Sequence, residues 1–131
     1  KFEKQRFIHF READPAGILF FGRLPEIYHD LFEEGLQEQL PWRELFANER
    51  LALPIRHLEV DYLRPMRAGV FYTWLVNVMK LTDHSVEVHL QVLHENHLHA
   101  HLKCVHVCVD QQAAQKTKLP AQWRAALEAL Q

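Results

Sequence analysis

The segment Asp14-Pro15-Ala16-Gly17-Ile18 holds the residues of this chain that are best suited to chemistry. It lies between an extended apolar run at residues 7–11 and a strongly helical run that begins near Arg23. A carboxylate in a tight turn before a buried helix can face the free backbone N–H groups at the start of that helix. One loop can then supply both a base or nucleophile, Asp14, and a binding site for a negatively charged oxygen. This layout is typical of acyl-transfer sites.

Several other catalytic motifs are missing. The four glycines form neither the phosphate-binding loop of nucleotide hydrolases nor the fingerprint of dinucleotide-binding enzymes. The only serine, Ser85, lies in a strand-like setting and not in a G-x-S-x-G turn. Nucleotide hydrolysis, hydride transfer and a serine nucleophile therefore lose support. A carboxylate, an imidazole or a thiol remains as the reactive group.

The composition indicates one domain over residues 1–131. With 48% hydrophobic residues, the chain is long enough to form one substantial core. The net charge of -2 gives no overall attraction to nucleic acid. No apolar run approaches the roughly 20 residues that cross a bilayer, and no apolar leader is visible. We therefore expect no nucleic-acid partner, no membrane span and a cytoplasmic location.

The two cysteines agree with a reducing compartment. Cys104 and Cys108 are four residues apart in a strand-like run. This spacing separates their Cα atoms by about 13 Å, beyond the reach of a disulfide. We expect two reduced, buried thiols.

A long amphipathic helix is predicted directly after the Asp14 loop. Its apolar residues recur three and four positions apart, at Leu24, Ile27, Tyr28, Leu31 and Phe32. Pro25 suits the first turn of such a helix, and the helix is expected to end between residues 35 and 39. Residues 41–46 are expected to form a short second helix, and a terminal amphipathic helix is expected after Pro120.

Beyond Pro54 the apolar period changes to two, which is typical of half-buried strands. We predict strands at residues 56–63, 70–81, 85–94 and 98–109, after a first strand at residues 7–11. The last four follow one another closely enough to be antiparallel neighbours. Only the long helix is apolar enough to cover their buried face. The sequence thus predicts an α+β fold, in which an antiparallel sheet of about five strands wraps around one helix. Its open edge and opposite face favour pairing with a second copy.

Three alternate histidines, His97, His99 and His101, resemble a metal site. Alternate residues of a strand project to one side but are about 6.6 Å apart, so one ion cannot reach all three without distortion. A solvated polar face is the better interpretation, and we expect no metal.

The motif Phe10-Arg11-Glu12-Ala13-Asp14-Pro15-Ala16-Gly17-Ile18-Leu19-Phe20-Phe21 resembles that of the hot-dog-fold acyl-CoA thioesterases of the 4-hydroxybenzoyl-CoA thioesterase type. The resemblance covers nearly the whole chain. Within that family the chain is most similar to the 1,4-dihydroxy-2-naphthoyl-CoA thioesterases of quinone biosynthesis, through Tyr28-His29-Asp30-Leu31-Phe32-Glu33, Leu53-Pro54-Ile55-Arg56-His57, Asp61-Tyr62-Leu63-Arg64-Pro65 and Leu119-Pro120-Ala121-Gln122-Trp123. Many relatives have Asp at the position of Glu12.

The resemblance implies that the chain hydrolyses an aromatic acyl-CoA, with 1,4-dihydroxy-2-naphthoyl-CoA as the first choice, to the free acid and coenzyme A. It also implies a homodimer or homotetramer that needs no cofactor. Two alternatives stay open. One is a thioesterase for other acyl groups, carried by coenzyme A or by a carrier protein, and the other is a non-catalytic acyl-CoA-binding module.

The family's catalytic position corresponds to Asp14, which could attack the thioester carbonyl or activate a water molecule. The alternative role for Asp14 is to cap a turn. The backbone N–H of Phe21, with that of Gly22 beside it, is the expected oxyanion donor. Gly17 would give the bend that lets the thioester approach, although it could equally be an ordinary turn glycine.

Substrate contacts are expected from Phe20, Tyr28 and His29. The histidine could hydrogen-bond a hydroxyl or carbonyl of an aromatic acyl group, or it could simply be a residue of the helix surface. Arg64 and Arg67 are candidates for binding the phosphates of coenzyme A, because arginine suits phosphate, although either could be an ordinary surface cation.

Overall fold

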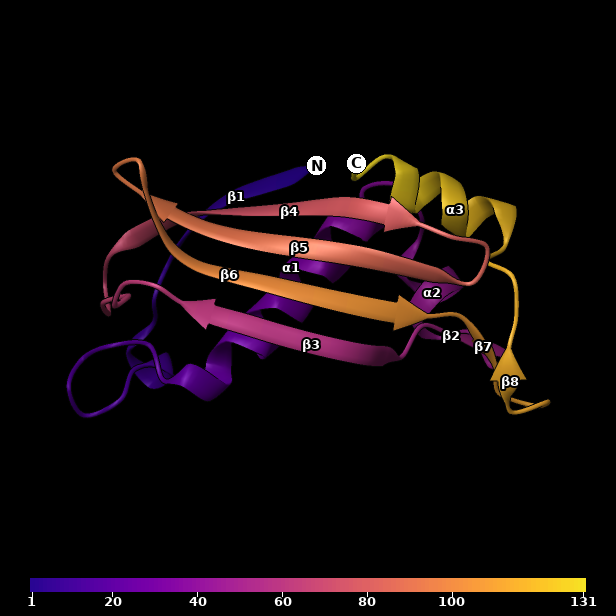
Figure 1. The fold of residues 1–131 in the computed structure, drawn as a ribbon, viewed down its shortest axis with the longest axis horizontal. Coiled ribbons are helices and arrows are strands. Elements are labelled where there is room, and N and C mark those ends of the chain that lie inside the picture. Colours follow the sequence, from indigo (N-terminus) through magenta and orange to yellow (C-terminus); the bar gives the residue numbers. More distant parts are fainter.

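The computed structural model describes all 131 residues and contains one five-stranded antiparallel sheet with a long helix against one face (Figure 1). The strand order is β1-β4-β5-β6-β3. The strands are β1 (Phe2–Phe7), β3 (Ile55–Tyr62), β4 (Phe71–Leu81), β5 (Ser85–His94) and β6 (His97–Val107). The long helix is α1 (Leu24–Gln37). This architecture confirms the predicted α+β fold.

Smaller elements close the two ends of this unit. Short 3₁₀ turns, η1 (Phe10–Glu12) and η2 (Phe21–Arg23), lie on either side of the Asp14 loop. The two other helices are α2 (Trp42–Phe46) and α3 (Ala121–Glu128), as predicted. A second small sheet has the order β2-β7-β8 and contains β2 (Leu51–Ala52), β7 (Val109–Asp110) and β8 (Gln115–Lys116). None of the helices combines the length and apolar character needed to span a membrane.

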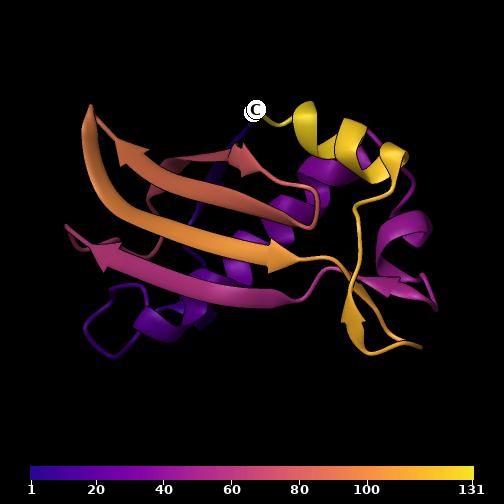
Figure 2. The same ribbon diagram turned by 45° about the vertical axis from the view of Figure 1, so that its right-hand side comes forward.

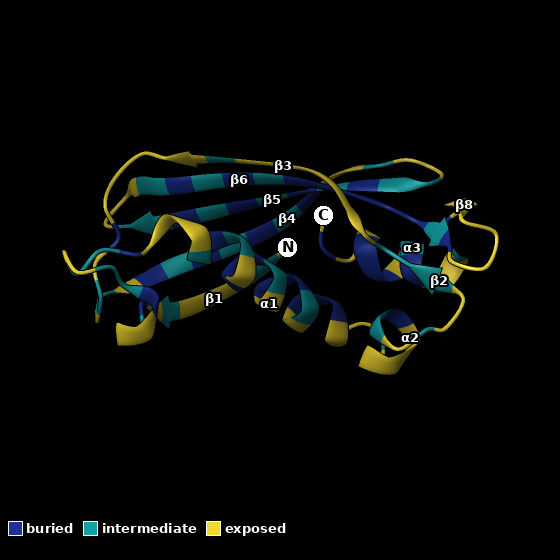
Figure 3. Ribbon diagram, turned by 90° about the horizontal axis from the view of Figure 1, so that it is seen from below, coloured by how far each residue is buried: buried dark blue, intermediate teal, exposed yellow.

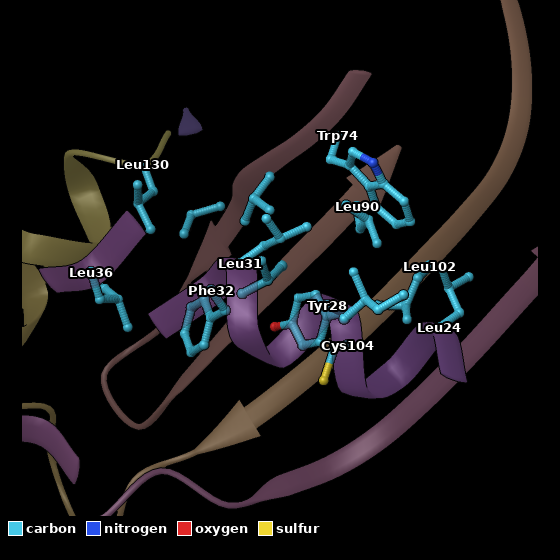
Figure 4. Packing of buried hydrophobic residues seen from close by; sticks show 14 of the residues in the cluster. Leu24, Tyr28, Leu31, Phe32, Leu36, Trp74, Leu90, Leu102, Cys104 and Leu130 are labelled. Carbon is cyan, nitrogen blue, oxygen red and sulfur yellow. The ribbon is translucent and has the colours of Figure 1, made fainter. Parts of the chain in front are cut away.

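The apolar face of α1 packs on the sheet, and the strands curve across it (Figure 2). Its buried positions follow the predicted spacing from Leu24 to Leu36. The facing side chains come from alternate residues of the strands, including Trp74, Leu90 and Leu102 (Figure 4). Each fully buried apolar side chain of this size contributes roughly 1.5–3 kcal/mol. The buried contact between helix and sheet therefore fixes where the start of α1 lies.

One polar network crosses this core. The Tyr28 hydroxyl lies 2.7 Å from Nε2 of His106, and Nδ1 of the same ring lies 3.0 Å from the Leu53 carbonyl oxygen. Because a carbonyl can only accept, Nδ1–H donates to Leu53 and Nε2 accepts from Tyr28. Burial lowers the pKa of His106 to about 4, although the bond to Leu53 opposes this shift, so the ring is neutral at pH 7. The network joins α1, β6 and the segment before β3.

Two predicted strand boundaries are wrong. The first strand is β1 at Phe2–Phe7 and not residues 7–11, because residues 2–7 pair with Phe71–Val76 of β4. The chain then leaves the sheet, and Glu12 accepts a 2.8 Å hydrogen bond from the His9 N–H to form η1. The last long strand stops at Val107, because Cys108 donates its N–H to His84 and Val109 pairs with β2. Both cysteines are buried and free.

Candidate active site

The Asp14 loop is closed by the carboxylate itself. Its Oδ1 accepts hydrogen bonds from the N–H groups of Ala16, at 2.9 Å, and Ile18, at 3.2 Å. Gly17 has φ = 77°, a left-handed conformation that residues with a Cβ rarely adopt. Its N–H also donates to the Asp14 carbonyl at 2.9 Å. Asp14 therefore caps this turn, while its Oδ2 has no hydrogen-bond partner in the chain.

A buried ion pair between Arg6 and Glu12 lies directly before the Asp14 loop. Glu12 is only 4% exposed and accepts hydrogen bonds from both terminal nitrogens of Arg6 and from the His9 N–H. Burial alone would raise the pKa of Glu12, but the bonds from Arg6 and His9 outweigh this effect and lower it to about 2. The Glu12 carbonyl also accepts from Phe20 N–H at 2.8 Å, so both ends of the loop are tied together.

A pocket of about 610 Å³ opens beside this loop. Seven of its eleven lining residues are hydrophobic. The lining comprises Asp14, Pro15, Ile18, Leu19, Phe20 and Phe21 from the loop and helix entrance, and Tyr62, Leu63, Arg64, Pro65 and Met66 from the end of β3 and the segment after it. A carboxylate and a guanidinium thus share a mostly apolar pocket, as expected of a small-molecule site.

Two unused backbone donors lie at the entrance to α1. The N–H groups of Phe20 and Arg23 are taken by carbonyl oxygens, but no acceptor in the chain takes the N–H of Phe21 or of Gly22. A Cβ on Gly22 would lie 2.8 Å from the Phe20 ring, so a larger residue there would displace this ring. Free amides at the start of a helix are suited to bind an oxyanion.

The structure brings together part of the predicted site. Asp14, Phe20, Phe21 and Arg64 line one pocket. Gly17 and Gly22 are in the loop and helix entrance that form its wall. Arg67 is exposed and does not line this pocket, although its backbone pairs with Ile18.

Tyr28 and His29, the other two expected substrate contacts, do not line the Asp14 pocket of the same chain. Tyr28 is 0% exposed, with its hydroxyl bonded to His106 inside the core (Figure 4). His29 lines a second pocket of about 390 Å³, between α1, α2 and the residues just before β3. Its Nδ1 lies 3.0 Å from a Glu33 carboxylate oxygen.

Sequence reasoning gave Tyr62 no role. Its hydroxyl donates to the Phe21 carbonyl oxygen, which joins the end of β3 to the entrance of α1. The supporting role of Glu12 was also missed, because nothing local in the sequence marks a glutamate as buried. No pattern within a single element predicts a contact between Tyr62 of β3 and Phe21 of η2.

The predicted histidine row is a polar face of the sheet. His99 Nδ1 lies 3.0 Å from the Pro65 carbonyl, while His101 Nε2 lies 3.0 Å from His89 Nδ1. His97 is exposed at the end of its strand. No group of three histidine, cysteine or acidic side chains is arranged to hold a metal ion.

Comparisons with known proteins identify the family of this chain. Residues 8–127 match the sequence profile of the thioesterase-like superfamily. The chain therefore belongs to the thioesterase-like superfamily, and it has the hot-dog fold. The 1,4-dihydroxy-2-naphthoyl-CoA hydrolase of Nostoc punctiforme is 30% identical over 126 residues, which cover 93% of this chain and 85% of that protein.

Solved structures show the same fold. A 1,4-dihydroxy-2-naphthoyl-CoA thioesterase from Synechocystis is similar with a TM-score of 0.89 at 22% identity, over 98% of this chain and 96% of that chain. A gentisyl-coenzyme A thioesterase is similar with a TM-score of 0.82 at 17% identity, over 95% of this chain and 98% of that chain.

The Glu12–Arg6 pair predicts how stability depends on pH. The pKa of Glu12 is lowered from 4.5 to about 2 on folding. The ionised carboxylate therefore adds to the free energy of unfolding above pH 4.5, and this stabilisation is lost as the pH falls toward 2. This shift corresponds to about 3 kcal/mol. We expect Glu12→Gln to lower the free energy of unfolding by about this amount at pH 7. Between pH 4.5 and pH 3 the free energy of unfolding should fall less steeply in this variant than in the wild type.

Urea denaturation at each pH measures both effects. Glu3→Gln is a matched control, because Glu3 is exposed and makes no ion pair. Equal stabilities of Glu12→Gln and Glu3→Gln at pH 7 would show that the buried pair does not hold the loop.

Proposed function

We propose that this chain is a cytoplasmic acyl-CoA thioesterase that hydrolyses 1,4-dihydroxy-2-naphthoyl-CoA to the free acid and coenzyme A, without a metal or organic cofactor. The observation that carries the proposal is the position of Asp14. It lies on a constrained turn in a mostly apolar pocket, next to a helix entrance with two free N–H groups. The names of the relatives favour this substrate over other acyl-CoA esters.

Asp14 supplies the reactive oxygen. Because Oδ1 is held by Ala16 and Ile18, Oδ2 is the atom free to act. In one route Oδ2 attacks the carbonyl carbon, the C–S bond breaks, and water hydrolyses the resulting anhydride. In the other, Oδ2 takes a proton from a water molecule that attacks the same carbon. In both, the carbonyl oxygen gains negative charge and the sulfur leaves as a thiolate that acquires a proton.

The helix entrance stabilises the charge on the carbonyl oxygen. The free N–H groups of Phe21 and Gly22 are the proposed donors, aided by the positive end of the α1 dipole. Donors fixed in advance need no reorganisation when the charge develops, and removing one such donor typically costs about 10²–10³-fold in kcat.

The pocket wall favours a flat aromatic acyl group. The Phe20 and Phe21 rings lie 4.7 Å apart, and Tyr62 faces the same pocket. A planar ring can stack on such a wall, whereas a flexible chain loses more conformational freedom on binding. Arg64 is the better placed of the two proposed phosphate ligands, because it lines the pocket and Arg67 does not.

A second copy is proposed to complete the site along β3. This edge strand carries the exposed apolar residues Ile55, Leu58 and Tyr62, and Figure 3 shows its exposed surface along one margin of the sheet. Antiparallel pairing of two β3 strands brings the Ile55 end of one copy beside the Tyr62 end of the other.

That arrangement gives His29 a role. Its pocket includes Leu53 and Pro54, which directly precede β3, so pairing places this pocket next to the Asp14 pocket of the second copy. His29 is then available to bind a hydroxyl of an aromatic acyl group across the interface.

Asp14→Asn is expected to fold normally and to lose about 10²-fold or more in kcat, because the amide is nearly isosteric but is neither a comparable base nor a nucleophile. Thiol release from the acyl-CoA, measured with EDTA present, gives the rate. Asp30→Asn is the matched control, since Asp30 is exposed on α1. Wild-type turnover by a folded Asp14→Asn protein would remove Asp14 from the mechanism.

The substrate is tested with a panel of thioesters. We expect kcat/KM to be higher for 1,4-dihydroxy-2-naphthoyl-CoA than for benzoyl-CoA or palmitoyl-CoA, and we expect His29→Ala to narrow the gap between hydroxylated and unsubstituted aromatic substrates. A preference for palmitoyl-CoA, or equal values for all aromatic thioesters, would contradict the substrate while leaving thioester hydrolysis intact.

The assembly is tested by light scattering. The wild-type mass is expected to be at least twice the 15.5 kDa of one chain, and Leu58→Lys is expected to lower it by placing a charge on the β3 edge. Glu3→Lys, on the opposite edge strand, serves as the control. A wild-type mass of one chain at micromolar concentration would reject the second copy.

A further inference from the structure

The carbonyl of Phe21 lacks the usual helical donor. In an α-helix each carbonyl accepts from the N–H four residues later. Four residues after Phe21 stands Pro25, which has no N–H. The proline suits the first turn of α1, but it leaves the Phe21 carbonyl without an α-helical partner.

Tyr62 supplies a donor to this carbonyl. Its hydroxyl donates a hydrogen bond to the Phe21 oxygen from the last residue of β3, on the facing wall of the pocket. Partial desolvation raises the pKa of Tyr62 above its usual value of 10.0, so the phenol stays protonated near neutral pH and remains a donor.

This bond acts on the neighbouring amide as well. The carbonyl of Phe21 and the N–H of Gly22 belong to one planar peptide group and point in opposite directions. Fixing the oxygen therefore fixes the direction of the Gly22 N–H. Gly22 has no side chain to restrict its φ and ψ angles, so a hydrogen bond to the Phe21 carbonyl has a larger effect on this peptide than it would before another residue.

We propose that Tyr62 is a positioning residue for thioester hydrolysis: its hydroxyl replaces the N–H that Pro25 lacks, and so keeps the Phe21–Gly22 peptide aimed at the developing oxyanion. This inference rests on the proposed function, because it assigns a task to the same site. Tyr62 acts through the backbone and transfers no proton itself.

The kinetic test removes the hydroxyl alone. Tyr62→Phe is expected to lower kcat about 10-fold, less than the roughly 10²-fold or more for loss of a donor itself, while KM stays within about 2-fold. The second variant, Tyr62→Phe with Pro25→Ala, introduces an N–H four residues after Phe21. If positioning is the role of the hydroxyl, this double variant recovers most of the lost kcat.

A spectroscopic test reads the same peptide without turnover. Gly22 is the only glycine that follows a phenylalanine, so a protein labelled with ¹³C-carbonyl phenylalanine and ¹⁵N-glycine gives a single correlation, from the Phe21–Gly22 bond. Tyr62→Phe should move the carbonyl signal upfield as its hydrogen bond is lost, and Pro25→Ala should move it back. Tyr72→Phe is the control, because the Tyr72 hydroxyl accepts from Arg67 N–H and does not contact this peptide.

The outcomes separate this inference from the proposed function. An active wild-type protein whose Tyr62→Phe variant keeps its kcat and its carbonyl signal overturns the positioning role alone. A second outcome is that Tyr62→Phe loses kcat, Pro25→Ala does not restore it, and the carbonyl signal does not move. This outcome assigns the hydroxyl to direct substrate contact and also overturns the positioning role. A wild-type protein that releases no thiol from any acyl-CoA overturns the proposed function and the positioning role with it.

Discussion

The apolar face of α1 has to be buried, and this requirement determines the position of almost everything else. Leu24, Leu31 and Leu36 are nearly inaccessible to solvent over the length of the helix, and the curved sheet covers this apolar stripe from one side. Because the helix is fixed along its whole buried face, its first turn is fixed too. The loop before it must then end at a defined place and direction, which sets where the Asp14 carboxylate lies relative to the free N–H groups of Phe21 and Gly22.

The buried polar side chains of this structure are all hydrogen-bonded. No buried side-chain nitrogen or oxygen lacks a hydrogen-bond partner. Glu12 is matched by Arg6 and His9, and His106 is matched by Tyr28 and Leu53. Such groups are costly to bury alone, so each network constrains the segments that it joins. One network holds the Asp14 loop, and the other holds the segment that leads into β3.

The sequence predicted those features that depend on nearby residues. The spacing of Leu24, Ile27 and Leu31 identified α1, and alternation identified the strands, because both signals arise from one element burying one face. The first strand was misplaced because residues 7–11 are apolar enough for a strand, while the true choice depends on the free edge of distant β4. Correct prediction of the helix and the sheet did not reveal which residues of distant elements meet around the Asp14 pocket.

What the sequence missed depends on contacts between distant segments. Tyr28 was expected at the substrate because of its motif, yet its position on the buried face of α1 directs it to His106. Asp14 and Phe21 were expected to lie together because they belong to one local motif, and both line the same pocket. The Tyr62 contact with Phe21 joins residues 41 positions apart, and no local pattern reveals it.

The two pockets of one chain are lined by different stretches of sequence. The Asp14 pocket is built from residues 14–21 and 62–66, whereas the His29 pocket is built mainly from residues 45–54. Substitutions in the second stretch can therefore reshape the His29 pocket and leave the Asp14 loop unchanged. The two pockets can therefore diverge independently in evolution, because a substitution in one stretch leaves the lining of the other intact.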